Sequence, residues 1–577
     1  MTGSTGDRLE RIRGLSDLLR GVRTAGLIPS CGTIPLLAEN LLAKAAAYAH
    51  RIKRSYLVII FAGGTGTGKS TLFNALCGTV LSAAGSARPT TSAPVVYAHR
   101  IAGFIETRPF DIPAVFTPAI LATNDTSNRE NGGWSVIEHE RQDFRHLALI
   151  DTPDVDSLVK HHKSITEKLA LMADAVVFVT SQEKYADAEP LNYLANIAAE
   201  KIPWYVLFNK TDPRANSTDC EAILETKGIP AAGTRLFVIP YIVPMTPESI
   251  EKTEEFRRFS RLIQRELSPS RTAVELSKNR RRQKMSLIRD CTILNDLLNE
   301  ERIAAESWID ELHSLGDIAG RSLVDAWESR FDRRHEEQVS RAIRRIYQRY
   351  DFLARPRRYL RRIVTFPLTF FGLLRSQDKE NPLDALQEVP KHIDVTPVCT
   401  AVNALQRSVL SQLSPKDSEA PLYSALREPL RSLSDGEVRQ FMIDRQEELA
   451  SWLAESIKEL TRGISKTKEI GIYTTSFIGA VIILSFEVIL GGGITVLEVL
   501  LDTFLAPVIS SGSVNVFAYG EVKTTLRRLN ERYREVLTEI VDLQIKRYEQ
   551  CIHSVLTQTE VVSALRNSMK VLENDDD

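Results

Sequence analysis

Cysteine is scarce in this chain of 577 residues: there are six, and no two of them lie at the spacing of a metal-binding pair. Their wide separation argues against a disulfide framework and against a zinc site. Reduced thiols in a cytoplasm, buried as small apolar side chains, fit this pattern best. The six are Cys31, Cys77, Cys220, Cys291, Cys399 and Cys551.

The chain also lacks net charge and a signal peptide. Its 73 basic and 74 acidic residues balance to a formal charge of -1. No overall field therefore attracts nucleic acid, and we expect no sequence-specific nucleic-acid partner. Residues 1–11 are polar and charged, so any membrane contact must come from a later segment. Length alone suggests roughly three to four domains.

The chain does contain a phosphate-binding loop, because residues 63–70 fit the pattern of Gly, four residues, Gly-Lys-Ser. Glycines let backbone N–H groups face phosphate oxygens, and a helix beginning near Lys69 would direct its positive end at the same anion. Lys69, a candidate catalytic residue, would reach the β- and γ-phosphates, and the Ser70 hydroxyl would ligate Mg²⁺. A glycine-rich turn without a ligand is the alternative. The predicted nucleotide-binding residues of this loop are Gly63, Gly64, Thr65, Gly66, Thr67, Gly68, Lys69, Ser70 and Thr71.

Strands and helices alternate from Tyr56 to about Ser268, which predicts an α/β domain with a doubly wound, mostly parallel sheet. Several apolar runs lack polar alternation, as expected for strands covered on both faces. Ligands of such sheets bind outside the carboxyl ends of the strands. Residues 100–145 show no clean periodicity and suggest a mobile insertion. The apolar runs are 56–61, 94–99, 147–151, 175–180, 204–209 and 236–240.

The run at 147–151 ends in Asp151, followed by Thr152, Pro153 and Asp154. An Asp at the end of a buried strand can hold Mg²⁺ through water. The segment resembles the Asp-x-x-Gly motif of P-loop GTPases of the TRAFAC class, with Asp154 where the Gly N–H contacts the γ-phosphate. Val155 stands where Ras-like proteins carry a water-orienting glutamine, and resembles the Era, TrmE and dynamin side of the class. The resemblance implies that another group, for example from a second protomer, positions the water.

A third motif, Asn209-Lys210-Thr211-Asp212, follows another buried run and matches Asn-Lys-x-Asp. A carboxylate can accept two hydrogen bonds from guanine N1–H and its exocyclic amine, a donor pair that adenine lacks. Asn209, Lys210 and Asp212 are therefore predicted to bind the nucleotide, which would be GTP or GDP with Mg²⁺. A polar strand-to-helix turn is the alternative.

Between the first two motifs, Pro89-Thr90-Thr91 precedes a strand. The segment resembles the mobile GTPase loop in which a threonine ligates Mg²⁺ and senses the γ-phosphate. Similar loops of Era and dynamin-like families favour Thr91 over Thr90, and an ordinary Pro/Thr turn is the alternative. The resemblance implies Ser70, Thr91 and Asp151 as metal ligands, with Thr91 also a candidate catalytic residue beside Lys69.

Beyond residue 269 the strand signals stop, and the sequence predicts a large all-α region. Within it, residues 355–375 place arginines beside an aromatic, apolar stretch. This segment fits an anionic membrane surface and a buried bundle helix equally well.

Residues 470–510 are largely apolar and carry only three charges, Glu487, Glu498 and Asp502. Their first half meets the length of ~20 residues needed to cross a bilayer. Positive charge on both flanks fits a hairpin that enters and leaves on the cytoplasmic face. We therefore expect an apolar, membrane-contacting helical hairpin, and a hairpin buried in the helical region is the alternative.

The helical layout resembles that of bacterial dynamin-like and mitofusin-like proteins, by analogy of layout alone. Residues 1–55 predict a helical segment packed on the next domain or on the C-terminal helices, and apolar residues at 3-4 spacing after residue 526 predict a long pairing helix. The predicted domains are 1–55, the N-terminal helical segment; 56–268, the GTPase domain; 269–468, the helical stalk; 469–512, the hydrophobic hairpin; and 513–577, the return helix with an acidic tail.

These features predict a GTP-binding, GTP-hydrolysing dynamin-like protein that couples nucleotide state to stalk movement and membrane association. It would be cytoplasmic and membrane-associated, contact lipid through 470–510 and 355–375, and form a homodimer or oligomer through its GTPase domains. One alternative is an Era-like regulatory GTPase that binds a protein or ribonucleoprotein and buries the hairpin in its own core. Another is a scaffold that binds GTP without hydrolysing it.

Overall fold

The computed structural model describes residues 2–82, 94–102, 119–120, 135–156, 160–212, 218–226, 228–229, 235–329, 395–462 and 516–574. The chain separates into two compact units. The first comprises Met1–Arg23, Ser30–Glu300 and Thr557–Asp577, and the second comprises Thr24–Pro29 and Glu301–Leu556. The five domain boundaries expected from the sequence stay predictions.

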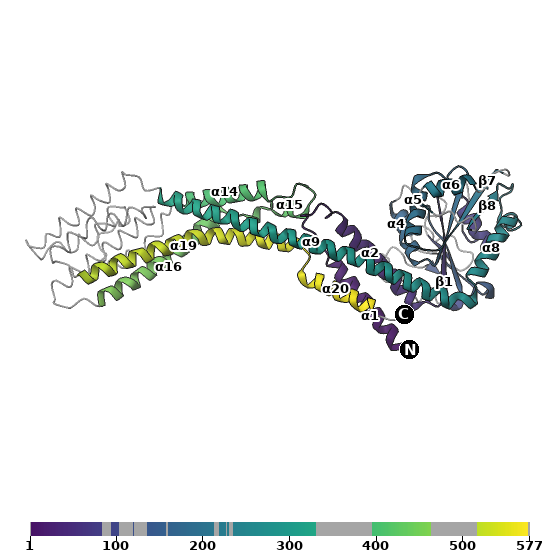
Figure 1. Ribbon diagram of the computed structural model, residues 1–577, viewed down its shortest axis with the longest axis horizontal. Helices are drawn as coiled ribbons and strands as arrows, with labels where there is room; N and C mark the ends of the chain where they lie inside the picture. The colour runs from purple at the N-terminus through teal and green to yellow at the C-terminus, as the bar shows by residue number, and fades with distance from the viewer. Residues whose placement is uncertain are drawn as a thin grey trace, which may run out of the picture. The chain divides into compact units, whose positions relative to one another are not determined.

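The first unit contains an eight-stranded sheet with strand order β3-β4-β2-β5-β1-β6-β7-β8. Helices surround this sheet (Figure 1). All neighbouring strands pair in parallel except β2 and β5. The prediction of a mostly parallel sheet is therefore confirmed. The strands are β1 (Leu57–Gly63), β2 (Val95–His99), β3 (Ala119–Ile120), β4 (Ser135–His139), β5 (Leu147–Asp151), β6 (Ala175–Ser181), β7 (Trp204–Thr211) and β8 (Leu236–Pro240).

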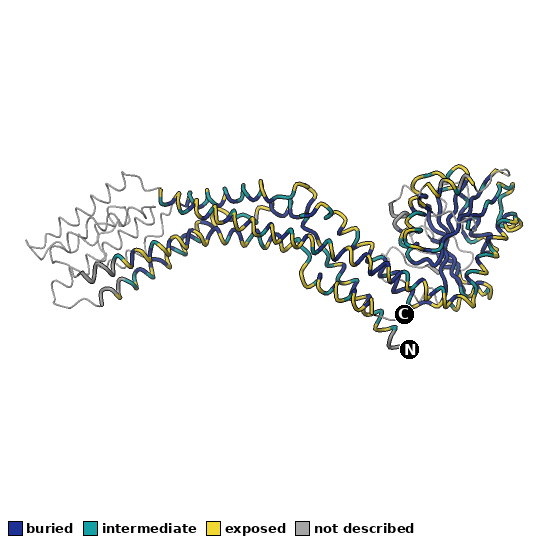
Figure 2. Tube along the Cα trace, viewed as in Figure 1, coloured by how far each residue is buried: buried dark blue, intermediate teal, exposed yellow. Residues whose placement is uncertain are grey.

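The strands in the middle of the sheet are buried (Figure 2). Alternate residues of β1 belong to two different hydrophobic cores, which explains the unbroken apolar run in its sequence. Val58 and Ile60 pack with α4 and α5, whereas Ile59 and Phe61 pack with α3 and α8. The helices around the sheet are α3 (Lys69–Cys77), α4 (Lys160–Met172), α5 (Ala188–Ala199), α6 (Thr218–Thr226), α7 (Pro247–Glu251) and α8 (Glu254–Glu266).

Strand β4 corrects the expectation for residues 100–145, which foresaw only a mobile insertion. It pairs with β2 in register from Val95–Ser135 to His99–His139. Only Val136 and Ile137 are apolar in this strand, so its apolar run was too short to predict a strand. Pairing with β2 supplies the stability instead.

Both alternatives for the N-terminal segment hold, because it forms two helices. α2 (Thr33–Lys53) packs on α4, and α1 (Thr2–Arg20) packs on the C-terminal α20 (Thr559–Glu573). After α1, the Thr557 hydroxyl accepts a hydrogen bond from the Arg23 N–H at 2.8 Å and donates to its carbonyl at 2.7 Å. The first and last helices of the described chain therefore belong to one compact unit.

The second unit is helical, as the sequence predicts. Its helices are the later part of α9 (Thr272–Glu328), α14 (Thr396–Gln412), α15 (Pro421–Ala425), α16 (Asp435–Arg462) and α19 (Val516–Val555). Leu529, Tyr533 and Ile540, members of the predicted 3-4 repeat of α19, are fully buried in its core. The Glu301 carboxylate accepts hydrogen bonds from the Thr24 hydroxyl and from the N–H groups of Ala25, Gly26 and Leu27 at 2.6–3.4 Å.

Two predicted membrane segments, 355–375 and 470–510, lie outside the described residues. Among the helices that are described, none has the length and hydropathy needed to cross a bilayer.

Candidate nucleotide-binding site

The predicted phosphate-binding loop connects β1 to α3, as its sequence requires. Gly66 and Gly68 have φ values of 76° and 90°, a left-handed conformation that glycine adopts without strain. A Cβ on Gly63 would lie 2.1 Å from the carbonyl oxygen of Val179 in β6. The loop therefore needs glycine for its conformation and for its close approach to the neighbouring strand.

The predicted guanine-binding motif, residues 209–212 and here called the guanine motif, lies directly against this loop. Asn209 Nδ2 donates to the carbonyl of Thr67 at 2.8 Å, and Lys210 Nζ donates to the carbonyl of Gly66 at 2.7 Å. Lys210 itself has a φ of 55°, so the chain turns sharply where β7 ends. Asp212 follows at the exposed edge, with its N–H bonded to Gln182 Oε1 at 2.9 Å. The two motifs thus meet as predicted.

Asp151 lies at the end of β5 and contacts the start of α3. Its Oδ2 accepts hydrogen bonds from the Ser70 hydroxyl at 2.6 Å and the Ser82 hydroxyl at 2.7 Å. Lys69 Nζ lies 3.3 Å from Asp151 Oδ1 and 3.5 Å from Asp154 Oδ1. No hydrogen bond reaches Asp151 Oδ1 within the described part of the chain. Ser82 carried no motif, and sequence reasoning missed it.

The segment after Asp151 is anchored to β1. The Val155 N–H donates to the carbonyl of Gly63 at 3.2 Å. The Val155 side chain is buried in the core that the sheet forms with α4 and α5. Thr152 Oγ1 donates to the carbonyl of Phe61 at 2.9 Å. A valine in this core position cannot orient a water molecule, in agreement with the sequence interpretation.

A further carboxylate, that of Asp156, lies against the phosphate-binding loop. It accepts hydrogen bonds from the N–H and the hydroxyl of Thr65 at 2.7 and 2.8 Å, and from Lys184 Nζ at 3.0 Å. Burial alone would raise the pKa of Asp156, but these donors outweigh it and hold the pKa below its ordinary value. Neither Asp156 nor Lys184 was a predicted site residue; the one available signal was that Lys184 follows a buried strand.

The structure thus brings together every predicted site residue except Thr91, which lies outside the described residues together with Thr90. The assignments of individual roles stay predictions. The set combines a glycine loop, two lysines, the Ser70 hydroxyl and three carboxylates near the carboxyl ends of the strands, which can hold a phosphorylated ligand with a divalent cation.

Comparison with known families agrees with this geometry. Residues 58–210 match the family model described as 50S ribosome-binding GTPase. The chain therefore contains a P-loop GTPase domain, the domain class of GTP hydrolases, and guanine nucleotide is its ligand class. No curated protein sequence matches the chain.

Solved structures similar to this chain include two described as an oligomerised bacterial dynamin pair for long-range sensing and tethering of membranes. They have TM-scores of 0.38 and 0.34 at 12% and 11% identity, covering 92% and 93% of this chain and 91% and 92% of theirs. A third, described as the LeoA bacterial dynamin GTPase from ETEC, has a TM-score of 0.24 at 12% identity, covering 94% of this chain and 99% of its own.

Proposed function

We propose that this protein is a dynamin-like GTPase that couples its nucleotide state to its helical region and to a membrane. The observation that carries the nucleotide part is the contact of Asn209 and Lys210 with the phosphate-binding loop. This contact joins the predicted base site to the predicted phosphate site at one edge of the sheet.

Magnesium fits the residues at the start of α3. Ser70 and Asp151 present a hydroxyl and a carboxylate, the oxygen ligands that Mg²⁺ prefers. Asp151 Oδ1 takes no hydrogen bond from the described residues and can accept one from a metal-bound water. Ser70, Asp151 and Thr91 would hold the ion, which would neutralise charge on the phosphates. Lys69 would add a fixed positive charge beside them.

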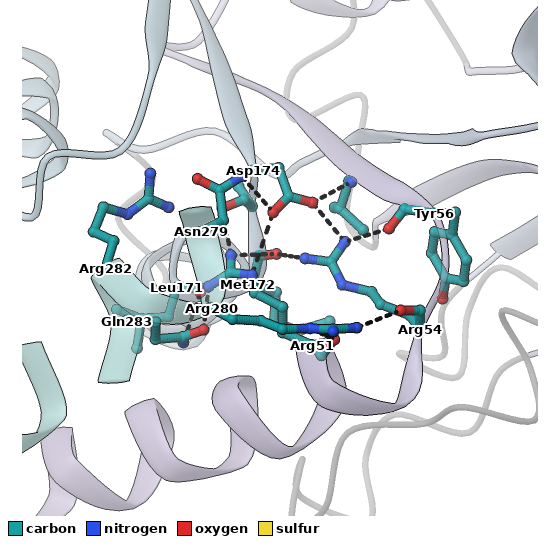
Figure 3. Close-up of polar contacts among 12 residues, drawn as sticks. Arg51, Arg54, Tyr56, Leu171, Met172, Asp174, Asn279, Arg280, Arg282 and Gln283 are labelled. Carbon is teal, nitrogen blue, oxygen red and sulfur yellow. Dashed lines mark hydrogen bonds and ion pairs between the residues drawn. The ribbon is translucent and has the colours of Figure 1, made fainter. Parts of the chain in front are cut away.

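Coupling to the helical region is supported by the end of α4, the helix that follows the Asp151 loop (Figure 3). Arg51 of α2, Arg54 just after α2, and Gln283 of α9 donate to carbonyls at and just after the end of α4. Arg51 Nη2 lies 2.7 Å from the carbonyl oxygen of Ala173, Arg54 Nη2 2.9 Å from that of Met172, and Gln283 Nε2 3.1 Å from that of Leu171. These donors satisfy carbonyls that a helix end leaves unpaired.

Asp174 forms ion pairs with both arginines at this helix end. Its carboxylate is fully buried and lies 3.2 Å from Arg51 Nε and 2.8 Å from Arg54 Nη1. It also accepts hydrogen bonds from Asn279 of α9 at 2.9 Å and from the N–H of Val58 in β1 at 2.8 Å. These buried ion pairs and hydrogen bonds restrain the elements that they join. A shift of α4 on nucleotide binding would therefore displace α2 and α9 as well.

Membrane contact and self-association complete the proposal. The apolar segment 470–510 and the basic, aromatic segment 355–375 would contact lipid on the cytoplasmic face. Because Val155 cannot orient water, a second copy of the GTPase domain would complete the catalytic site.

The proposal is tested by steady-state GTP turnover at several protein concentrations, with and without anionic liposomes. We expect turnover per molecule to rise with both. Turnover that depends on neither would contradict the dynamin-like part while leaving the GTPase domain in place.

A second candidate is an Era-like regulatory GTPase, which is favoured by the description of the family that residues 58–210 match. Such a protein would bind a protein or ribonucleoprotein and bury 470–510 in its own core. Liposome flotation of the intact chain and of a variant lacking 470–510 separates the two. A dynamin-like protein floats when intact and loses much of its flotation without the segment, whereas an Era-like protein does not float in either form.

A further inference from the structure

The Asp156 carboxylate accepts hydrogen bonds from groups of Thr65 that would also donate to a phosphate oxygen. Its Oδ1 accepts from both the backbone N–H and the hydroxyl of Thr65, at 2.7 and 2.8 Å. Thr65 belongs to the phosphate-binding loop, whose N–H groups bind phosphate oxygens in this class of site. Gly64 precedes Thr65 in the loop, and a Cβ added to Gly64 would lie 3.1 Å from Asp156 Oδ2. The negatively charged carboxylate of Asp156 therefore contacts the same loop that is predicted to bind the nucleotide phosphates.

The cation in this contact is Lys184, in the turn after β6. Gly63 of β1 pairs with Val179 of β6, so the turn lies beside the phosphate-binding loop. Lys184 Nζ contacts Asp156 Oδ2 at 3.0 Å and Asp187 Oδ2 at 3.2 Å. The hydrogen bond to Asp156 raises the pKa of Lys184 above its ordinary value, so the side chain is a stable ammonium ion at neutral pH.

Two charges of the same sign cannot share these donors at low cost, because repulsion between anions a few ångströms apart is strong away from bulk water. Binding of a terminal phosphate beside Thr65 would therefore expel the Asp156 carboxylate. Lys184 would then lose one of its two acidic partners, and the phosphate oxygens would offer it a replacement.

We propose that Lys184 binds the γ-phosphate of GTP by exchanging its contact with Asp156 for one with the phosphate. Asp156 then weakens the binding of GTP more than the binding of GDP. This inference rests on the proposed guanine-nucleotide binding. The exchange involves no covalent step. Because Asp156 lies four residues before the start of α4 at Lys160, its displacement would move the chain that leads into that helix.

The test compares the affinity of the full-length chain for GDP and for a non-hydrolysable GTP analogue, by calorimetry. For K184Q we expect roughly tenfold or weaker binding of the analogue, as for the loss of a charged hydrogen bond, with GDP affinity unchanged. K184R should restore most of the affinity for the analogue. D156N should bind the analogue several-fold more tightly than the wild type and leave GDP affinity unchanged.

K278Q is the matched control, since the exposed Lys278 pairs with Glu275 in α9, away from the nucleotide site, and both affinities should equal those of the wild type. If K184Q lowers the affinities for the analogue and for GDP equally, or lowers neither affinity, Lys184 has only a structural role and the inference is wrong. If the wild type binds neither nucleotide, the proposed function itself fails, which is a separate outcome from a failure in K184Q alone.

Discussion

Gly68 shows how one backbone conformation positions the base-recognition motif. Its φ of 90° is left-handed, and a Cβ at this position would lie 2.4 Å from Asn209 Nδ2. Alanine would add conformational strain of roughly 1–2 kcal/mol. It would also displace the Asn209 amide that donates to the Thr67 carbonyl. One methyl group would therefore disturb both the loop and the guanine motif.

We expect Gly68→Ala to weaken GDP binding roughly tenfold or more, since 1.4 kcal/mol corresponds to a factor of ten. Titration with a fluorescent GDP analogue measures this. Gly228→Ala is the control, because Gly228 also has a positive φ but a Cβ there meets no atom of the described residues within 4 Å. Equal losses of affinity in the two variants would show that strain alone, and not the contact with Asn209, is responsible.

At the scale of the element, the start of α16 is stabilised by a capping arrangement. Glu437 Oε2 accepts hydrogen bonds from the N–H and the hydroxyl of Ser434 at 2.9 and 2.8 Å. Arg547 of α19 donates to Glu437 Oε1 at 2.6 Å. The hydrogen bond from Arg547, followed by those from Ser434, lowers the pKa of Glu437 from 4.5 to about 2. This carboxylate therefore joins two helices of the second unit.

The sign of this shift predicts a specific acid dependence. A carboxyl group whose pKa is lower in the folded state stabilises it fully above its ordinary pKa. That stabilisation is lost as the pH falls from about 4.5 to about 2. We expect Glu437→Gln to lower the Tm at pH 7 and to flatten the Tm profile across this interval, as followed by circular dichroism. Glu455→Gln, on the exposed face of the same helix, should change neither; an unchanged profile in Glu437→Gln would refute the assignment.

At the scale of the whole molecule, Asp174 connects the sheet, α2 and α9 within the first unit. Removing one partner of a buried ion pair leaves the other charges uncompensated, which costs about 3–5 kcal/mol. We expect Asp174→Asn to lower the free energy of unfolding by that amount, as measured by urea denaturation.

Asp17→Asn provides the comparison, since Asp17 pairs with Arg20 at the exposed surface of α1. Such pairs contribute about 0–1 kcal/mol. A loss in Asp174→Asn no larger than in Asp17→Asn would mean that the buried network does not hold the helices together.

The sequence by itself determined the α/β domain and most of its ligand site. Long apolar runs specified the strands around β1, because strands buried on both faces need no polar alternation. The phosphate-binding loop, Asp151 and the guanine motif each carried a local pattern, and the sheet topology brings such strand ends together. It also predicted the helical region and the long helix after residue 526.

Only the tertiary structure decided the contacts between residues that share no local pattern. β4, Ser82, Asp156 with Lys184, and the Asp174 network depend on partners far away in the sequence. A single Asp or Lys has the same local sequence signal whether it is solvated or buried against a distant partner. Its role is set by burial and by the charges that folding places around it.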